Sequence, residues 1–215
     1  MQAIPVGLES APMSSMTTPD ILRRPITLAD LLPLERITPG VRDIALVVGG
    51  AALTALAAQV AFSVPWTPVP YTLQTGAVLL VGTALGSARG ALSMLLYVLV
   101  GAAGLPVYAQ ASGGSEHLVG ATGGYLIGFI VAAAIVGYLA QKGWDRQFGT
   151  AAGLMVIGTL IVYAIGVPVL AIVTGFPFAD ALEVGALVFL PWDLAKVLLA
   201  AGLLPYAWRV AGERD

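Results

Sequence analysis

The sequence contains no cysteine and little charge, and these two absences exclude several classes of protein. Without cysteine there is no disulfide, no thiolate metal site and no cysteine nucleophile. Charged residues make up 10% of the 215 residues, against roughly a quarter in a soluble domain, and 58% of the residues are hydrophobic. This composition is typical of a protein whose solvent is a lipid bilayer.

Three further absences narrow the chemistry. The net charge of −2 provides no basic surface for nucleic acid. No GxxxxGK[ST] motif occurs, so the chain has no P-loop with which to hydrolyse ATP. His117 is the only histidine, and no second His, Cys or acidic cluster stands at ligand spacing, so we expect a loop residue there and not a metal ligand. The sequence therefore predicts neither a metal site nor a bound cofactor.

Long apolar stretches predict an all-α membrane protein with six transmembrane helices. The expected spans cover residues 44–62, 73–85, 90–103, 122–140, 151–173 and 184–204. The second and third are shorter than the ~20 residues that cross a bilayer. Either their flanking loops dip into the membrane, or their boundaries differ by several residues. Short, interrupted segments of this kind often mark binding sites in transporters.

Basic residues lie almost entirely on one side of this predicted topology. The first, third and fifth connections contain no Lys or Arg, so nine of the ten basic residues share the other side. These are Arg23, Arg24, Arg36, Arg42, Arg89, Lys142, Arg146, Arg209 and Arg214. By the positive-inside rule this side is the cytoplasm. We therefore expect a multi-pass protein of the cytoplasmic (inner) membrane with both termini in the cytoplasm.

The first 42 residues lack an uninterrupted apolar run, so we interpret them as a cytoplasmic tail and not as a cleaved signal. Within this tail, the stretch ITLADLLPLERI (26–37) is compatible with an amphipathic surface helix or with a disordered tail. Nothing in the sequence assigns a role to it.

The tenth basic residue, Lys196, lies in the last predicted span, three residues after Asp193. An ionised group at membrane depth costs at least ~2.5–3.5 kcal/mol on insertion scales. The spacing puts both side chains on one helix face, close enough to neutralise each other. The pair is either a structural ion pair or part of a polar pocket. We favour the pocket, because intramembrane ionisable residues usually mark a solute or ion path, and this pair suits a neutral, amide-like solute.

The connection over residues 63–72 contains three prolines, which stiffen an extended conformation and remove backbone donors. It leads into Thr72, Gln74 and Thr75, which are uncharged hydrogen-bonding residues at the head of the second span. This region forms either an aromatic belt beside a polar helix start or a lid over a solute.

The first span presents small residues at helical spacing, including Ala51 and Ala55. A helix with such a smooth face packs closely against another helix. That second helix belongs either to the same bundle or to another subunit.

Together these residues resemble the BioY family, the biotin-binding S component of energy-coupling factor (ECF) transporters. The resemblance covers residues 44–208 and is carried by Gln59 with four motifs. The motifs are PWTPVPYTLQT (65–75), GLPVYA (104–109), TGGYLIGF (122–129) and PWDLAK (191–196). It implies six helices of ECF S-component type, a biotin pocket near the outer face, and a lid made of the first and third connections.

The resemblance also implies roles for individual residues. Asp193 and Lys196 would bind the polar groups of biotin, with Asp193 accepting a ureido NH and Lys196 meeting an oxygen. The further substrate-binding residues implied are Thr72, Gln74, Tyr97, Ser115 and Tyr125. Ala51 and Ala55 would dock on the transmembrane coupling subunit of the transporter, which also contains two ATPase subunits.

We therefore expect a biotin-capture subunit and not an enzyme, with a tail over residues 1–42, a biotin-binding bundle over 43–208 and a second tail over 209–215. One alternative is an S component or secondary carrier for another solute, with Asp193 as a proton relay. Another is an intramembrane hydrolase. That reading lacks support, because no Ser–His pair or second carboxylate accompanies Asp193 among the spans.

Overall fold

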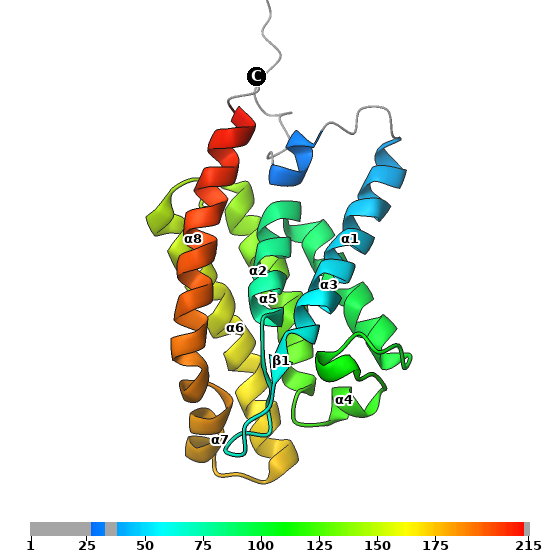
Figure 1. Ribbon diagram of the computed structural model, residues 1–215, viewed down its shortest axis with the longest axis vertical. Helices are drawn as coiled ribbons and strands as arrows, with labels where there is room; N and C mark the ends of the chain where they lie inside the picture. Colours follow the sequence, from blue (N-terminus) through cyan, green and yellow to red (C-terminus); the bar gives the residue numbers. More distant parts are fainter. Residues whose placement is uncertain (1–26, 33–37, 213–215) are drawn as a thin grey trace, which may run out of the picture.

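The computed structural model describes residues 27–32 and 38–212, and within them the chain forms a bundle of helices (Figure 1). The long helices are α1 (Pro39–Gln59), α2 (Gln74–Leu85), α3 (Ser87–Ala102), α5 (Gly123–Gln141), α6 (Phe148–Thr174) and α8 (Leu190–Gly212). The short elements are η2 (Leu28–Leu31), β1 (Ala61–Phe62), β2 (Tyr71–Thr72), η3 (Ala109–Ala111), α4 (Glu116–Val119), α7 (Phe178–Gly185) and η4 (Leu187–Phe189). The prediction of an all-α bundle is confirmed, and its six expected spans correspond to the six long helices.

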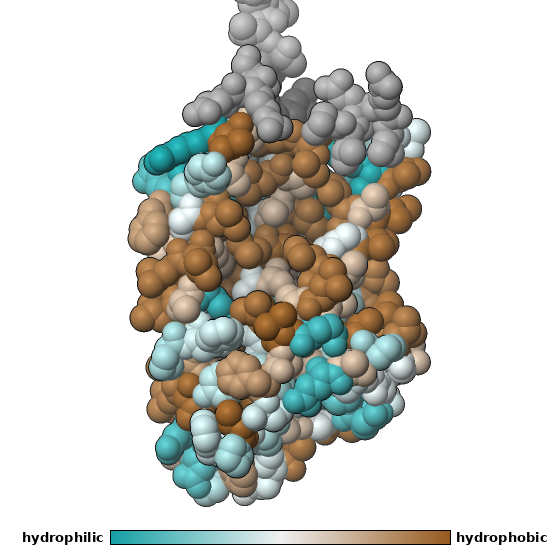
Figure 2. Space-filling view, viewed as in Figure 1, coloured by the Kyte–Doolittle hydropathy of each residue, from teal (hydrophilic) through white to brown (hydrophobic). Residues whose placement is uncertain are grey.

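Four helical stretches are long and apolar enough to cross a membrane, namely Pro39–Gln59, Gly123–Gln141, Phe148–Thr174 and Phe178–Ala211. The helices α2 and α3 are apolar but contain only 12 and 16 residues. They therefore stay as short as the sequence indicated. Hydrophobic residues cover the middle of the face seen in Figure 2, as expected for a surface that contacts lipid.

The first and last predicted spans differ in their bounds from the helices of the structure. The first helix begins at Pro39, inside the stretch expected to be a tail, and ends at Gln59 because the chain then enters β1. The last long helix begins only at Leu190, because Ala186 leaves helical geometry (φ −139°, ψ −56°) and separates it from α7. The fifth connection, expected to be a simple loop, thus contains most of α7.

Glycine lets three helices meet closely in the centre of the bundle. A Cβ added at Gly82 of α2 would lie 2.7 Å from the Ala133 backbone of α5. One added at Gly90 of α3 would lie 2.8 Å from the Cα of Gly82. Such close backbone approach is the usual way in which membrane helices gain packing contacts. The short helices α2 and α3 are thereby held against α5.

The two ends of the bundle differ in character. The segment η2, the start of α1 and the end of α8 lie at one end, whereas β1, α4 and α7 lie at the other (Figure 1). At the first end, Arg42 and Arg89 both contact Asp30, and Arg146 lies over the ring of Trp208. We call this the basic end. Arg23, Arg24, Arg36 and Arg214 lie outside the described residues.

A buried carboxylate lies in the connection between α5 and α6 at the basic end. Asp145 is 1% exposed, and its Oδ2 accepts a hydrogen bond from Trp208 Nε1 at 2.7 Å. Its Oδ1 has no hydrogen-bond partner among the described residues. Burial raises the pKa of the Asp145 carboxyl, and the hydrogen bond from Trp208 only partly opposes this effect.

This raised pKa predicts that the contribution of Asp145 to stability grows as the pH is lowered. The native state binds a proton at Asp145 more readily than the unfolded chain does, so the contribution is complete below the unfolded pKa and is lost as pH rises through the folded value. Asp145→Asn keeps an acceptor for Trp208 and removes the charge. We expect its melting temperature at about pH 7 to equal or exceed that of the wild type, with a smaller gain than the wild type shows as the pH falls from neutral toward the ordinary range of a carboxyl pKa. Thermal unfolding in detergent measures both, and an unchanged pH response in the variant would contradict the assignment.

Candidate solute-binding site

A cavity of about 360 Å³ lies toward the end of the bundle opposite the basic end. Its walls come from the β1–β2 connection, α2, the segment around α4, α5, α6 and the start of α8. A volume of this size falls within the range of roughly 300–1,000 Å³ typical of small-molecule pockets. Sequence segments more than a hundred residues apart thus combine into one site.

Asp193 and Lys196 lie together on the wall that α8 provides. The Lys196 Nζ donates to Asp193 Oδ1 at 2.8 Å and to Thr75 Oγ1 of α2 at 2.6 Å. Asp193 is 5% exposed, so this residue is almost wholly enclosed. Because both charges are paired and hydrogen-bonded, their burial is tolerated, and both residues line the cavity.

Tyr163 of α6 completes this polar group, and the sequence did not point to it. Its hydroxyl donates to the second carboxylate oxygen of Asp193. Its ring packs edge-on against Tyr125 of α5, with the centroids 6.4 Å apart. The only available signal was that Tyr163 is the single aromatic residue in the apolar stretch 151–173. We call Tyr163, Asp193, Lys196 and Thr75 the polar cluster.

A second polar contact lies at the start of α2. Gln74 is buried, lines the cavity and donates through Nε2 to the hydroxyl of Tyr97 at 2.9 Å. Tyr97 lies behind Gln74 and not on the cavity wall. We interpret Tyr97 as the support that holds the Gln74 amide in place. The amide can present a donor and an acceptor to an uncharged polar solute.

The connection from β1 to β2 covers one side of the cavity. Tyr71 stacks on Phe62, with the ring centroids 5.0 Å apart, and its hydroxyl donates to the Val188 carbonyl at 2.9 Å. Thr67 Oγ1 donates to the Val184 carbonyl at 2.6 Å. These bonds tie the proline-rich connection to the α7–η4 region. The arrangement is that of a cover over the cavity.

The connection between α3 and α5 covers the other side. Gln59, at the end of α1, donates to the Tyr108 carbonyl at 3.2 Å and accepts from the Ala111 amide at 2.9 Å. Gln110 Nε2 donates to Ser63 Oγ at 2.8 Å and thereby joins the two covers. Both Gln110 and Ala111 have positive φ (60° and 53°), so this part of the chain is held in a conformation that L residues rarely adopt.

The structure brings most of the predicted binding residues together. Asp193, Lys196, Thr72, Gln74 and Tyr125 line the cavity. Tyr97 supports Gln74 from behind. Ser115 lies just before α4 and is not part of the cavity wall. In this region the wall is formed by Glu116 and His117 instead. The roles of these residues in binding stay predictions.

Ala51 and Ala55, the two residues predicted to dock on a partner, do not lie on the exposed face of α1. Ala51 is 8% exposed and packs in the core, because α1 turns this side toward the bundle. Ala55 is half-buried, whereas Ala52, Leu53 and Leu56 are exposed. The exposed face of α1 is therefore offset from the predicted pair by about one position.

The cavity combines polar and apolar surfaces. Charge is supplied by Asp193, Lys196 and Glu116, and apolar surface by Leu126, Phe129 and Phe189. Within the described residues, no three His, Asp or Glu side chains gather as metal ligands would. Such a site suits a small molecule with a compact polar group at one end and an apolar body.

Comparisons with known proteins agree with this geometry. Residues 25–213 match the BioY family. Among similar proteins, the biotin transporter BioY of Thermotoga maritima is 44% identical over 139 residues, which cover 65% of this chain and 80% of that protein. The biotin transporter BioY of Rhizobium etli is 35% identical over 158 residues, 70% of this chain and 84% of that protein. A probable biotin transporter BioY from Pyrococcus horikoshii is 41% identical over 159 residues, 74% and 91% respectively.

A solved structure shows the same fold. The S-component for biotin from an ECF-type ABC transporter superposes with a TM-score of 0.72 at 23% sequence identity, over 80% of this chain and 95% of that one. Three observations lead to one conclusion: the motifs around Gln74 and Asp193, the helix bundle that brings them together, and the match over residues 25–213. The chain belongs to the BioY family.

Proposed function

We propose that this protein captures biotin with high affinity at the outer face of the cytoplasmic membrane and takes it up as the substrate-binding subunit of an ECF-type transporter. The cavity with the polar cluster on its wall is the observation that carries the proposal. Membership of the BioY family supports biotin as the solute.

The chemistry of the cavity matches that of biotin. The ureido ring offers NH donors and a carbonyl acceptor, for which Asp193 and Lys196 provide an anionic acceptor and a cationic donor. Gln74 and Thr72 add uncharged partners, and Tyr125 with Phe129 provides apolar and aromatic surface for the rest of the molecule. Glu116 at the α4 side does not favour an anionic group close to it, so the carboxylate of biotin is expected to lie away from this residue.

In the proposed cellular setting, the protein lies in the cytoplasmic (inner) membrane with both termini in the cytoplasm. The basic end supports that orientation, because basic residues favour the cytoplasmic side. The cavity then faces outward. The sequence has no P-loop, and the energy source that we propose is partner ATPases acting through a membrane coupling subunit.

Docking on that coupling subunit is proposed to occur through α1. The exposed face of this helix, with Ala52, Leu53 and Leu56, is apolar, and Ala55 lies at its edge. Ala51 takes part only if α1 rotates away from the core. A membrane helix with small residues on its contact face allows close approach of another helix.

Titration of the purified protein with biotin tests the proposal. We expect saturable binding with a Kd on the order of 1 µM or tighter, equivalent to about −8 kcal/mol. Riboflavin and thiamine at the same concentrations are expected not to compete. Absence of biotin binding, or equal competition by either of the other vitamins, would show that the solute is different. Proton-driven uptake into vesicles without ATPase partners would favour a secondary carrier.

A further inference from the structure

The segment of residues 27–32 is packed against the basic end and is not a free tail. Thr27 is 1% exposed and Ala29 is also buried. The segment lies over the turn between α2 and α3, where Gly86 has φ +83° and a Cβ added to it would lie 3.0 Å from the Thr27 side chain. Of the stretch for which an amphipathic helix and a disordered tail were both open, the part that the structure describes forms a short 3-10 turn packed on the bundle.

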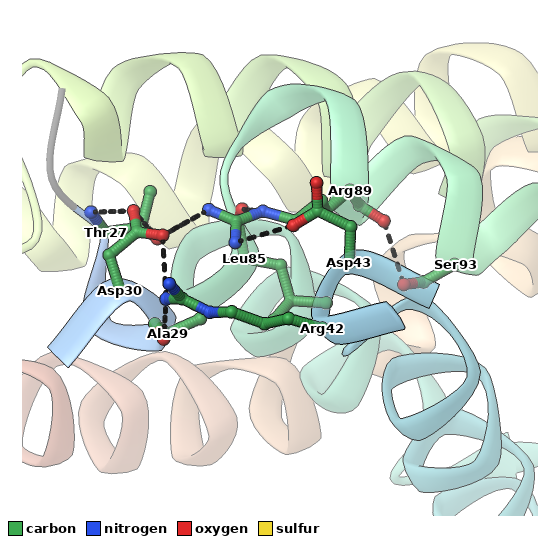
Figure 3. Close-up of polar contacts among 8 residues, drawn as sticks. All are labelled: Thr27, Ala29, Asp30, Arg42, Asp43, Leu85, Arg89 and Ser93. Carbon is green, nitrogen blue, oxygen red and sulfur yellow. Dashed lines mark hydrogen bonds and ion pairs between the residues drawn. The ribbon is translucent and has the colours of Figure 1, made fainter. Parts of the chain in front are cut away.

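Asp30 is the centre of the contacts that this segment makes (Figure 3). Its Oδ2 accepts from the Thr27 amide at 3.0 Å and from Thr27 Oγ1 at 2.8 Å. Its Oδ1 accepts from Arg42 Nη2 at 3.2 Å and from Arg89 Nη2 at 2.8 Å. Four donors therefore converge on one carboxylate, which is the maximum that its two oxygens ordinarily accept.

The two arginines belong to different helices, so Asp30 links the start of α1 to α3, beside the direct but longer pair of Asp43 with Arg89 at 3.5 Å. Arg42 comes from the first turns of α1 and also donates to the Ala29 carbonyl at 2.9 Å. Arg89 comes from α3 and also donates to the Leu85 carbonyl at 3.0 Å and to Thr27 Oγ1 at 3.2 Å. The carboxylate thus compensates two guanidinium groups that would repel each other without it.

The ionised form of Asp30 is the one that the site favours. Burial by itself raises the pKa of this carboxyl, but the hydrogen bonds from Thr27 and Arg89 and the charge of Arg89 outweigh burial, so the pKa lies below its ordinary value. The carboxylate therefore stays charged at physiological pH.

The start of α1 has few other contacts, chiefly the exposed pair of Asp43 with Arg89 at 3.5 Å and the partly buried Leu46, which packs against the core. Over residues 38–49, all of which the structure describes, none is buried, and the first buried residue of the helix is Gly50. From there on α1 packs closely, since a Cβ at Gly50 would lie 2.6 Å from Ser93 Oγ, and Thr54 is fully buried. Figure 1 shows the start of α1 beside the turn η2 at the basic end. Close packing thus secures only the half of α1 nearer the cavity.

We propose that residues 27–32 form a clasp that, through Asp30, holds the first half of α1 at a fixed position relative to α3. Without the clasp, this half-helix moves independently of the half that packs from Gly50 onward. The clasp is a property of the chain alone and lies at the opposite end from the cavity. Its test therefore does not depend on the solute or on the proposed transport partners.

Distance measurements between spin labels test the clasp, and the absence of cysteine lets labels be placed only where cysteine is introduced. One pair, Val41→Cys with Thr150→Cys, reports on the start of α1 against α6, and both residues are exposed. A second pair, Leu56→Cys with Ile172→Cys, reports on the far half of α1. In Asp30→Asn we expect the first distance distribution to broaden and lengthen, and the second to stay as in the wild type.

Asp43→Asn is the matched control. It removes the same charge from the same network, but Asp43 is 59% exposed on its side chain and contacts only Arg89, at 3.5 Å. We expect wild-type distributions for this variant and biotin binding within about twofold of wild type for both, because distant sites contribute independently. If Asp30→Asn does not fold, Thr27→Val removes the hydroxyl that bonds Asp30 and Arg89 and gives a milder version of the same change.

Two results would overturn the proposal. The first is an unchanged Val41–Thr150 distribution in whichever of Asp30→Asn and Thr27→Val folds, because α1 would then be held by other contacts. The second is equal broadening in Asp30→Asn and Asp43→Asn, because the effect would then follow from net charge and not from the clasp.

Discussion

Replacing Lys196 by methionine is expected to weaken biotin binding by on the order of 100-fold, the equivalent of about 2.7 kcal/mol for a lost charge-assisted hydrogen bond. The substitution keeps the volume of the side chain but removes the ammonium group that contacts both Asp193 and Thr75. It also leaves an enclosed carboxylate that accepts a hydrogen bond from Tyr163 but has lost its cationic partner. Isothermal titration of the purified variant measures the loss. Lys142→Met, at the basic end, is the control and should bind as the wild type does.

A double variant separates the two readings of this pair. If Asp193 and Lys196 only neutralise each other, Asp193→Asn combined with Lys196→Met should restore binding, because two uncharged side chains bury at little cost. If both contact biotin, the double variant should bind no better than either single variant. We expect the second result. Wild-type affinity in both single variants would contradict the assignment of the site.

Adding one methyl group at Gly82 is expected to destabilise the bundle more than any substitution on its surface. The new Cβ of Gly82→Ala would lie 2.7 Å from the Ala133 backbone, which has no side-chain freedom with which to move away. Overpacking of this kind costs about 3 kcal/mol at the upper end of its usual range. For a chain of this size the melting temperature should fall by roughly 6–12 °C. Thermal unfolding in detergent, followed by circular dichroism, gives the value.

Gly153→Ala is the matched control for this prediction. Gly153 is also inside a long helix, α6, but a Cβ added there meets no atom within 4 Å. Alanine is favoured over glycine in a helix, so this variant should be as stable as the wild type or slightly more stable. A similar loss of stability in both variants would mean that helix flexibility, and not close packing, explains the effect at Gly82.

The sequence predicted the part of the site that lies within one helix. Asp193 and Lys196 are three residues apart, so helical geometry alone places them on one face. Tyr163 lies 30 residues earlier in a helix without charged residues, and nothing local indicates that its hydroxyl meets Asp193. For Ser115 and Ala51, conversely, the sequence pattern indicated a position that the tertiary structure does not give them. Both lie in suitable motifs, but the packing of α4 and α1 keeps Ser115 off the cavity wall and turns Ala51 toward the core.

The N-terminal stretch shows a further limit of sequence patterns. Its pattern left an amphipathic helix and a disordered tail open, whereas in the described residues 27–32 a single carboxylate makes the contacts with the bundle. Asp30 contacts Arg42, 12 residues away, and Arg89, 59 residues away. A hydropathy pattern records the apolar face of a helix but not a polar bond across such a separation.

The sequence by itself determined that this is a six-helix membrane protein with one basic end, and its motifs indicated the family. Those properties follow from hydropathy and charge, which can be summed along the chain without knowing which residues are in contact in the folded protein. Only the tertiary structure decided that Tyr163 joins Asp193, that two loops cover one cavity and that Asp30 joins α1 to α3. The physical reason is that hydrogen bonds and ion pairs depend on distances of about 3 Å between particular atoms, which only the folded arrangement of the helices sets.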